Sequence, residues 1–174
     1  MPVDHHKPFL SIITVVLNDA ENLKKTLDSI SSEIQTSFEC ILIDGGSKDH
    51  TLDVARNYEV LFSEIVSEAD KGIYDAMNKG IRLAKGRYIS FMNAGDVFVN
   101  PYIIDRVFDG TLKEADIIYG DSLADYSSFT LYKKARPHNA LWKGMAFCHQ
   151  SSFVRTQLLK DEPFDTHFGI AADY

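Results

Sequence analysis

The sequence predicts an α/β fold, a Rossmann-like and mostly parallel sheet with helices on both of its faces. Two observations carry this prediction. Short runs rich in Ile, Val and Phe recur along the chain, and segments with the spacing of amphipathic helices lie between them. Right-handed crossovers would place these strands in one sheet. The length of 174 residues and the 45% of hydrophobic residues fit one folded domain with a sizeable core.

Strands and helices are expected to alternate in the first part of the chain. The strands are expected at residues 9–17, 38–43, 61–66 and 87–92. The first helix is expected over residues 20–34, with Asn18 or Asp19 as its N-terminal cap. A second helix is expected over residues 49–58. A third, over residues 73–84, has one apolar face and ends just before a glycine.

The pattern becomes less regular after residue 101. A short helix is expected to end near residue 108, and a strand is expected at residues 116–119. The aromatic residues that follow are Tyr126, Phe129, Tyr132 and Trp142. Among them, Tyr126, Tyr132 and Trp142 suit either a core, the commoner case, or stacking on sugar rings. The run 133–136 is expected to be a solvated basic face, with a contact to a phosphate or a lipid phosphate as the alternative.

Charge and cysteine content exclude several classes of protein. The formal charge of −7 argues against a nucleic-acid partner, because nucleic acid calls for a basic surface. Cys40 and Cys148 are too few for a disulfide framework, so a cytoplasmic protein is expected, with a place at the inner face of the membrane compatible with this. No signal peptide is expected. No transmembrane segment is expected either, because the longest apolar run, residues 9–17, is far shorter than the roughly 20 residues that span a bilayer.

The ends of the first two predicted strands differ in their chemistry. No glycine-rich turn follows the first strand, which argues against a dinucleotide-binding fingerprint and a P-loop. The second strand runs into Asp44, whose carboxylate could accept hydrogen bonds from a base or a ribose. The segment from Asp44 to Asp49 is also what a turn followed by a helix requires, with Ser47 or Asp49 as the cap.

The fourth predicted strand runs into Asn93-Ala94-Gly95-Asp96. Ligands of open α/β sheets bind beyond the carboxyl ends of the strands, so Asp96 is placed to meet a ligand or its metal. Turn chemistry explains the same residue types. The loop alone leaves both interpretations open.

Taken together, these segments resemble glycosyltransferase family 2, the A-type glycosyltransferase fold, over essentially the whole chain. The resemblance is closest to bacterial members that build exopolysaccharides and other surface glycans. The matching segments are residues 11–17, the Asp-x-Gly-Ser-x-Asp segment 44–49, the DKGIYDAMNKG segment 70–80, the Asn-Ala-Gly-Asp loop 93–96, His149-Gln150-Ser151 and Ala172-Asp173-Tyr174.

The resemblance implies roles for individual residues. A nucleoside-diphosphate sugar is the implied donor, and a glycan or a lipid-linked molecule is the implied acceptor. Transfer is expected to proceed with inversion. The residues expected to bind the nucleotide sugar are Val16, Asn18, Asp44, Asp70, Lys71, Asn78 and Asn93.

The metal of the implied site is Mg²⁺ or Mn²⁺, held through Asp96. A metal that bridges the diphosphate stabilises the charge of the leaving group. Two departures from the family pattern weaken this expectation, because the acidic positions of the loop are occupied by Asn93 and Gly95. Asp96 is then the one clear carboxylate.

The general base that the resemblance implies is Asp173; taken without it, that residue would simply lie in a helix. His149 is expected either at the rim on the acceptor side or as a satisfied residue of the core. A single domain over residues 1–174 is expected, with its nucleotide-binding part at about 8–100 and its acceptor-side part at about 101–174. Relatives continue further, so a truncated chain is expected. The alternatives are a non-catalytic nucleotide- or glycan-binding module and a nucleotidyltransferase.

Overall fold

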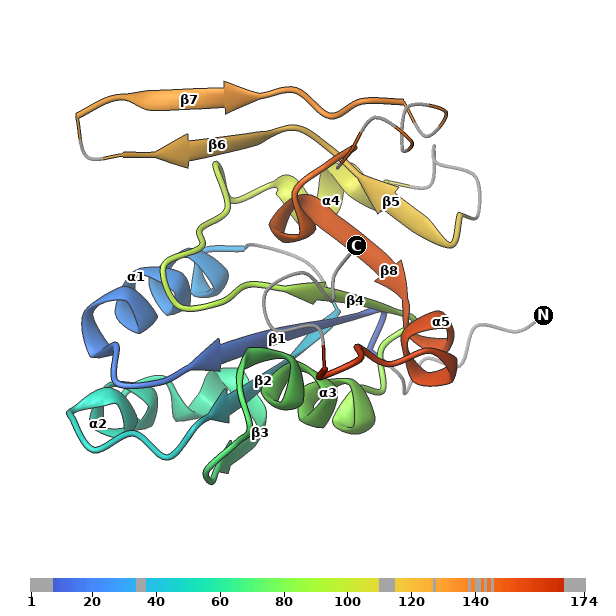
Figure 1. Ribbon diagram of the computed structural model, residues 1–174. Coiled ribbons are helices and arrows are strands. Elements are labelled where there is room, and N and C mark those ends of the chain that lie inside the picture. The colour runs from blue at the N-terminus through green and yellow to red at the C-terminus, as the bar shows by residue number, and fades with distance from the viewer. Residues whose placement is uncertain are drawn as a thin grey trace.

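The computed structural model describes residues 8–33, 37–109, 115–126, 128–137 and 146–167, together with residues 139, 142 and 144. Its main feature is a six-stranded sheet with the order β3-β2-β1-β4-β8-β5 (Figure 1). The strands are β1 (Leu10–Val16), β2 (Phe38–Asp44), β3 (Phe62–Ser67), β4 (Tyr88–Phe91), β5 (Ile117–Tyr119) and β8 (Ser152–Arg155). The first four are parallel, and β8 runs antiparallel to both of its neighbours.

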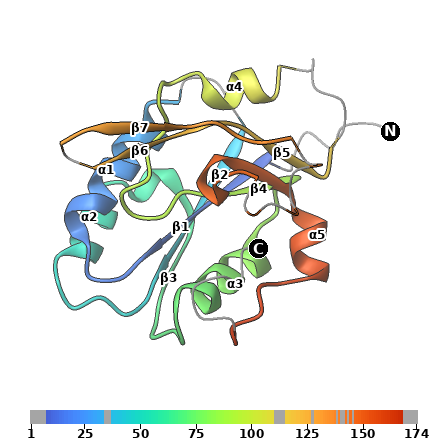
Figure 2. The same cartoon turned by 45° about the horizontal axis from the view of Figure 1, so that its top comes forward.

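Helices cover both faces of this sheet (Figure 2). The helices are α1 (Ala20–Ser31), α2 (Thr51–Arg56), α3 (Ile73–Leu83), α4 (Ile103–Val107) and α5 (Thr156–Asp161), with two 3₁₀ turns, η1 (Glu59–Leu61) and η3 (His149–Ser151). Helix α3 packs on one face through Met77 and Ile81, with α5 beside it. Helices α1, α2 and α4 pack on the other face. The predicted α/β fold is therefore confirmed.

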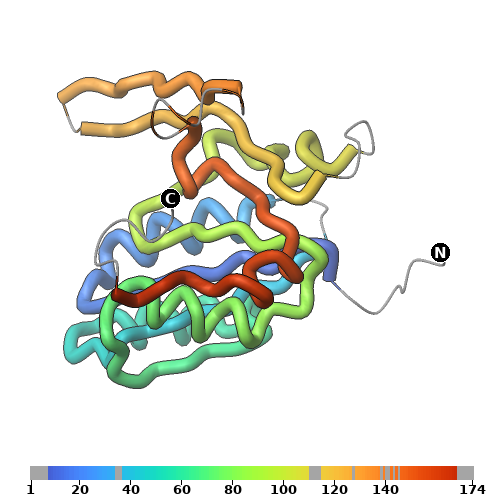
Figure 3. Tube along the Cα trace, turned by 45° about the vertical axis from the view of Figure 1, so that its right-hand side comes forward, coloured from blue at the N-terminus to red at the C-terminus, as the bar shows by residue number. Residues whose placement is uncertain are grey.

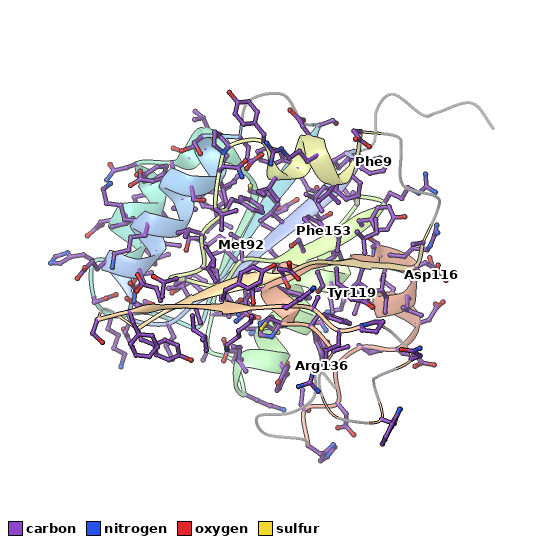
Figure 4. The ribbon with its side chains drawn as sticks, turned by 90° about the horizontal axis from the view of Figure 1, so that it is seen from above. Phe9, Met92, Asp116, Tyr119, Arg136 and Phe153 are labelled. Carbon is purple, nitrogen blue, oxygen red and sulfur yellow. The ribbon has the colours of Figure 1, made fainter. Side chains whose placement is uncertain are left out.

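The apolar core lies on both sides of β1, β2 and β4. On the α3 face the side chains of Ile13 and Ile41 are fully buried. On the opposite face, Phe9, Met92 and Phe153 belong to one cluster, and Figure 4 shows them from above. Alternate residues of a strand point to opposite faces, so the continuous apolar runs of the sequence are what two covered faces require.

The helices are close to their predicted positions, with informative differences. Asp19 caps α1, because its Oδ1 accepts a hydrogen bond from the amide of Asn22 at 3.3 Å. Helix α2 is shorter than predicted, and Asp49 accepts from the amide of Thr51 at 3.0 Å. Helix α3 begins at Ile73 as predicted, but this side chain is 45% exposed and does not join the apolar face.

The stretch after residue 119, whose sequence pattern is less regular, contains three strands. Strands β6 (Ser122–Asp125) and β7 (Thr130–Lys133) form a separate two-stranded hairpin, and β8 enters the main sheet. Both ends of the hairpin carry exposed aromatic side chains, among them Phe129 and Tyr132. Beyond β7, the carbonyl of Arg136 accepts a hydrogen bond from the hydroxyl of Tyr119 at 3.2 Å (Figure 4).

The buried carboxylate of Glu39, near the start of β2, links residues near the starts of β1 and β4. Oε1 of Glu39 accepts hydrogen bonds from the Ser11 hydroxyl at 2.6 Å, the Lys85 amide at 2.6 Å and the Gly86 amide at 3.0 Å. Glu39 is 8% exposed. A Cβ added at Gly86 would lie 2.6 Å from the backbone nitrogen of Ser11. Position 86 therefore requires glycine because two backbones approach closely there.

Candidate functional site at the carboxyl edge of the sheet

Three loops meet where β1, β2 and β4 end. Val16 of β1 is paired with Asp44 of β2, and the amide of Gly45 donates to the Val16 carbonyl at 2.9 Å. The amide of Ala94, which follows β4, donates to the Val15 carbonyl at 3.2 Å. The parallel sheet thus brings the predicted site segments 16–18, 44–49 and 93–96 together at the carboxyl ends of the strands, where open α/β sheets bind their ligands. We call these segments the first, second and third loops, and the end of the sheet at which they lie its carboxyl edge.

Asn18 links the first loop to the second. Its amide donates to the Ser47 hydroxyl at 2.7 Å, and its Oδ1 accepts from the Lys48 amide at 2.8 Å. Asn18 adopts a φ of 49°, a left-handed conformation that asparagine tolerates better than most residues. The neighbouring Val16 side chain is 3% exposed and packs in the core, so its backbone is the part that lies at the edge.

Asp44 is fully buried and orders the second loop. Its carboxylate accepts hydrogen bonds from the amide of Gly46 at 3.2 Å, the amide of Ser47 at 3.0 Å and the hydroxyl of Ser67 at 2.6 Å. The carboxylate oxygens of Asp44, which were predicted to bind a base or a ribose, therefore accept hydrogen bonds from this chain's own loop. Ser67, at the end of β3, was missed by the sequence patterns, although a polar residue that ends an apolar strand was a usable signal.

Asp70 and Lys71 lie between β3 and α3, beside the second loop. A Cβ added at Gly45 would lie 2.8 Å from Oδ2 of Asp70, so the two segments touch. Oδ1 of Asp70 accepts from the amide of Gly72 at 3.1 Å. The amide of Lys71 donates to Asp75 at 3.0 Å, and its side chain is exposed. Lys71 is thus placed at the rim of the same edge.

Asp96 closes the third loop. Its Oδ2 accepts from the amide of Asn93 at 3.0 Å. Gly95 has a φ of 102°, and its amide donates to the hydroxyl of Thr26 at 2.9 Å, which ties the loop to α1. Burial raises the pKa of Asp96, while the Asn93 amide and the charge of His149 oppose that rise.

His149 is brought to this loop by the fold. It begins η3, which packs against β4, and its charge acts on Asp96. Asn93 contributes a second polar atom, because its Oδ1 is buried and has no hydrogen-bond partner among the described residues. The sequence placed His149 at the rim or in the core, and no sequence pattern connected it with Asp96.

One predicted site residue, Asn78, does not join the three loops. Asn78 is 8% exposed on α3, and its amide contacts the backbone of Phe164. Asp173 lies outside the described residues. Within the described ranges, no group of three or more His, Cys, Asp or Glu side chains could hold a metal ion. In the third loop, the described side-chain oxygens that could bind a metal are those of Asp96 and Oδ1 of Asn93, and His149 lies nearby.

Comparison with known proteins identifies the class. The family model described as Glycosyl transferase family 2 matches residues 11–172. The "PGL/p-HBAD biosynthesis glycosyltransferase" of Mycobacterium bovis is 35% identical over 173 residues, which cover 96% of this chain and 67% of that protein. This chain therefore belongs to glycosyltransferase family 2.

Solved structures show the same fold. The crystal structure of S. aureus TarS 1-349 aligns with a TM-score of 0.69 at 19% identity and covers 94% of this chain and 52% of that one. The mannosyltransferase PcManGT from Pyrobaculum calidifontis, in complex with GDP-Man and Mn²⁺, aligns with a TM-score of 0.67 at 17% identity and covers 93% of this chain and 49% of that one. The chain thus spans about half the length of these structures, and its fold is the A-type glycosyltransferase fold.

Proposed function

We propose that this protein is an inverting glycosyltransferase that moves a sugar from a nucleoside-diphosphate sugar to an acceptor hydroxyl in the synthesis of a bacterial exopolysaccharide or surface glycan. The observation that carries this proposal is the meeting of the three loops at one edge, with Asp96 half-buried at the end of the third. Family membership and the relative named for PGL/p-HBAD biosynthesis support it.

The donor is proposed to lie along the edge formed by the first and second loops. Asn18 links these two loops and Asp44 orders the second, so the backbone around Ser47 offers a surface to the base and the ribose. Lys71 at the rim supplies a cation for a phosphate. We therefore propose that the part of the chain at about 8–100 binds the nucleotide and that the part at about 101–174 forms the acceptor side.

The third loop offers few protein ligands to a divalent metal. Asp96 would hold it, and Oδ1 of Asn93 is a buried acceptor whose hydrogen-bonding capacity is unused within the described residues. Mg²⁺ commonly binds through one or two carboxylates together with substrate phosphates. The bound metal would neutralise the charge that develops on the departing diphosphate. A complex of PcManGT with GDP-Man and Mn²⁺ supports this assignment.

The acceptor side is proposed to use Asp173 as its general base, because an acceptor hydroxyl is a weak nucleophile until its proton is removed. The proposed acceptor is a glycan or a lipid-linked molecule, and the proposed location is the cytoplasm or the inner face of the membrane. In the part of the chain that the structure describes, no helix combines the length and the apolar character needed to cross a bilayer.

UDP or another nucleoside diphosphate is expected to bind this chain and to raise its melting temperature. A ligand at 100 times its Kd stabilises the folded state by about 2.7 kcal/mol. Replacing Asp44 by Ala removes the acceptor of the Gly46 and Ser47 amides, so we expect the loop to lose its order and UDP binding to weaken by about 1 to 3 kcal/mol. Isothermal titration calorimetry on the folded variant measures this loss.

The matched control is Asp161→Ala, which removes an exposed carboxylate on α5 and leaves the three loops intact. Asp44→Asn, which keeps one oxygen acceptor, should lose less affinity than Asp44→Ala. An Asp44→Ala protein with the UDP affinity of the control would exclude the second loop from the nucleotide site.

Metal binding is expected to depend on the nucleotide. With one carboxylate and one amide oxygen, the protein alone should bind Mn²⁺ weakly, and UDP should strengthen that binding by adding phosphate oxygens. Electron paramagnetic resonance of free Mn²⁺, with and without UDP, measures the difference. Asp96→Ala should leave only the Mn²⁺ binding of UDP itself, as measured without protein. Tight Mn²⁺ binding to the nucleotide-free protein, or an unchanged effect in Asp96→Ala, would contradict this assignment.

A further inference from the structure

The third loop is attached to α1 through the hydroxyl of Thr26, a residue that is 0% exposed. Its Oγ1 accepts a hydrogen bond from the amide of Gly95 at 2.9 Å. The hydrogen of the same hydroxyl has two acceptors within reach, the Asn93 carbonyl at 3.2 Å and the Asn22 carbonyl at 3.3 Å. One buried hydroxyl thus contacts two backbone groups of the third loop, and its burial strengthens these hydrogen bonds.

The backbone groups that Thr26 contacts belong to the turn that holds Asp96. The Asn93 carbonyl also accepts a hydrogen bond from the Asp96 amide at 2.9 Å, and the Asn93 amide donates to Oδ2 of Asp96 at 3.0 Å. Gly95 makes the turn possible, because its φ of 102° favours glycine. Asn93 therefore connects the Thr26 hydroxyl with the Asp96 carboxylate.

Helix α1 supports the segment after β4 at more than one point. Ser29 lies one turn after Thr26, and its Oγ accepts a hydrogen bond from the Phe98 amide at 2.7 Å. Figure 3 shows the chain that leaves β4 passing beside α1. The helix itself is anchored in the core by Leu23 and Leu27, which are fully buried. A well-packed helix therefore sets the position of the third loop.

We infer that Thr26 is a positioning residue for the Asp96 carboxylate and so for the divalent metal of the proposed site. This inference rests on the proposed function. Asn93 and Gly95 occupy acidic positions of the family pattern, which leaves Asp96 as the carboxylate of this loop. Groups that orient a metal ligand contribute strongly to metal affinity, and a site with one carboxylate depends on how that carboxylate is held. Because Thr26 is buried, its hydroxyl acts through the turn and does not bind the metal itself.

The decisive variant is Thr26→Val, which keeps the shape of the side chain and removes its hydroxyl. Calorimetry gives the Kd of UDP with saturating Mn²⁺ and with a chelator, and the ratio of the two is the enhancement by the metal. This enhancement should fall by about tenfold, the usual scale for losing a group that orients a metal ligand. The Kd of UDP without metal should stay within about twofold, because the nucleotide is proposed to lie along the first and second loops. Thr26→Ser keeps the hydroxyl and should recover most of the enhancement.

The matched control is Thr156→Val, which makes the same replacement far from the third loop. Thr156 is 8% exposed, and its hydroxyl donates to the Gly86 carbonyl at 2.7 Å, just before β4 begins. Each variant loses a buried hydroxyl, so the melting temperature of both should fall by roughly 2 to 6 °C. Only Thr26→Val should lose the enhancement by Mn²⁺. Wild-type enhancement in Thr26→Val, or an equal loss in Thr156→Val, would overturn the inference.

Hydrogen exchange tests the attachment of the loop without metal or nucleotide. Exchange of the Gly95 amide should accelerate by about tenfold or more in Thr26→Val, while the amides of β1 and β2 keep their protection. Unchanged exchange at Gly95 would show that the hydroxyl does not hold the loop and would also overturn the inference. Failure of the proposed function is distinguishable, because the wild-type protein itself would then bind neither UDP nor its complex with Mn²⁺.

Discussion

Replacing Glu39 by Ala is expected to lower the free energy of unfolding by about 3 to 5 kcal/mol. The variant removes a buried acceptor that the Ser11 hydroxyl and the Lys85 and Gly86 amides share. Each buried donor left without an acceptor costs about 1 to 3 kcal/mol, and the cavity left by the side chain adds to the loss. For a domain of this size the melting temperature should fall by roughly 6 to 20 °C.

Differential scanning calorimetry and urea unfolding measure this loss. Ser63→Ala is the control, because the Ser63 hydroxyl lies 3.5 Å from the same carboxylate and donates to the Cys40 carbonyl at 2.9 Å. Its loss should lower stability by only about 1 kcal/mol. Gly86→Ala tests the same junction from the backbone, since its Cβ would lie 2.6 Å from the nitrogen of Ser11. A Glu39→Ala protein as stable as the Ser63→Ala control would show that the network contributes little.

Replacing Asp173 by Asn in the active enzyme is expected to lower kcat by about 10²-fold or more, because general-base catalysis contributes on that scale. The change preserves the size of the side chain and removes its ability to take a proton. Donor binding should be nearly unchanged, since the nucleotide is proposed to lie along the first and second loops. Steady-state kinetics at saturating donor and acceptor, with calorimetry for UDP, give the two quantities.

Glu162→Gln supplies the control for the loss of one negative charge, because this exposed carboxylate follows α5 directly. Its kcat should remain within about twofold of the wild-type value. Full turnover by Asp173→Asn would assign the proton transfer to another residue. A large loss of UDP affinity in Asp173→Asn would instead place that carboxylate beside the donor.

The parts of the fold that local patterns encode were predicted well. The four parallel strands and α3 follow from apolar runs and helical spacing, and the turn after β2 follows from its glycines. The predicted cap of α2 was wrong, because His50 rather than Ser47 or Asp49 occupies its N-cap position. Strand β8 was missed because it is short and its partners, β4 and β5, lie far away in the sequence. The hairpin of β6 and β7 was missed because its side chains are largely exposed and show no alternation of apolar and polar residues.

The candidate site, like the fold, was predicted in part from local sequence patterns. The sequence placed Asn18, Asp44 and Asp96 at strand ends, and the parallel sheet brings those ends together. It could not show that the Asp44 carboxylate is buried among its own loop amides or that Asn78 contacts Phe164, since these contacts depend on side-chain direction and on segments distant in the chain. The proximity of His149 to Asp96 likewise arises from η3 packing on β4.

The position of β8 affects how the protein folds during its synthesis on the ribosome. Strands β1 to β4 leave the exit tunnel first and can pair with one another. The side of β4 that faces away from β1 stays unpaired until residues 152–155 have emerged. Synthesis at about 5 to 20 residues per second leaves that side open for seconds. An unpaired strand edge is a template for association with other chains. Nascent chains arrested before β8 should therefore recruit holdase chaperones, and this recruitment should end once residues 152–155 have emerged and paired with β4.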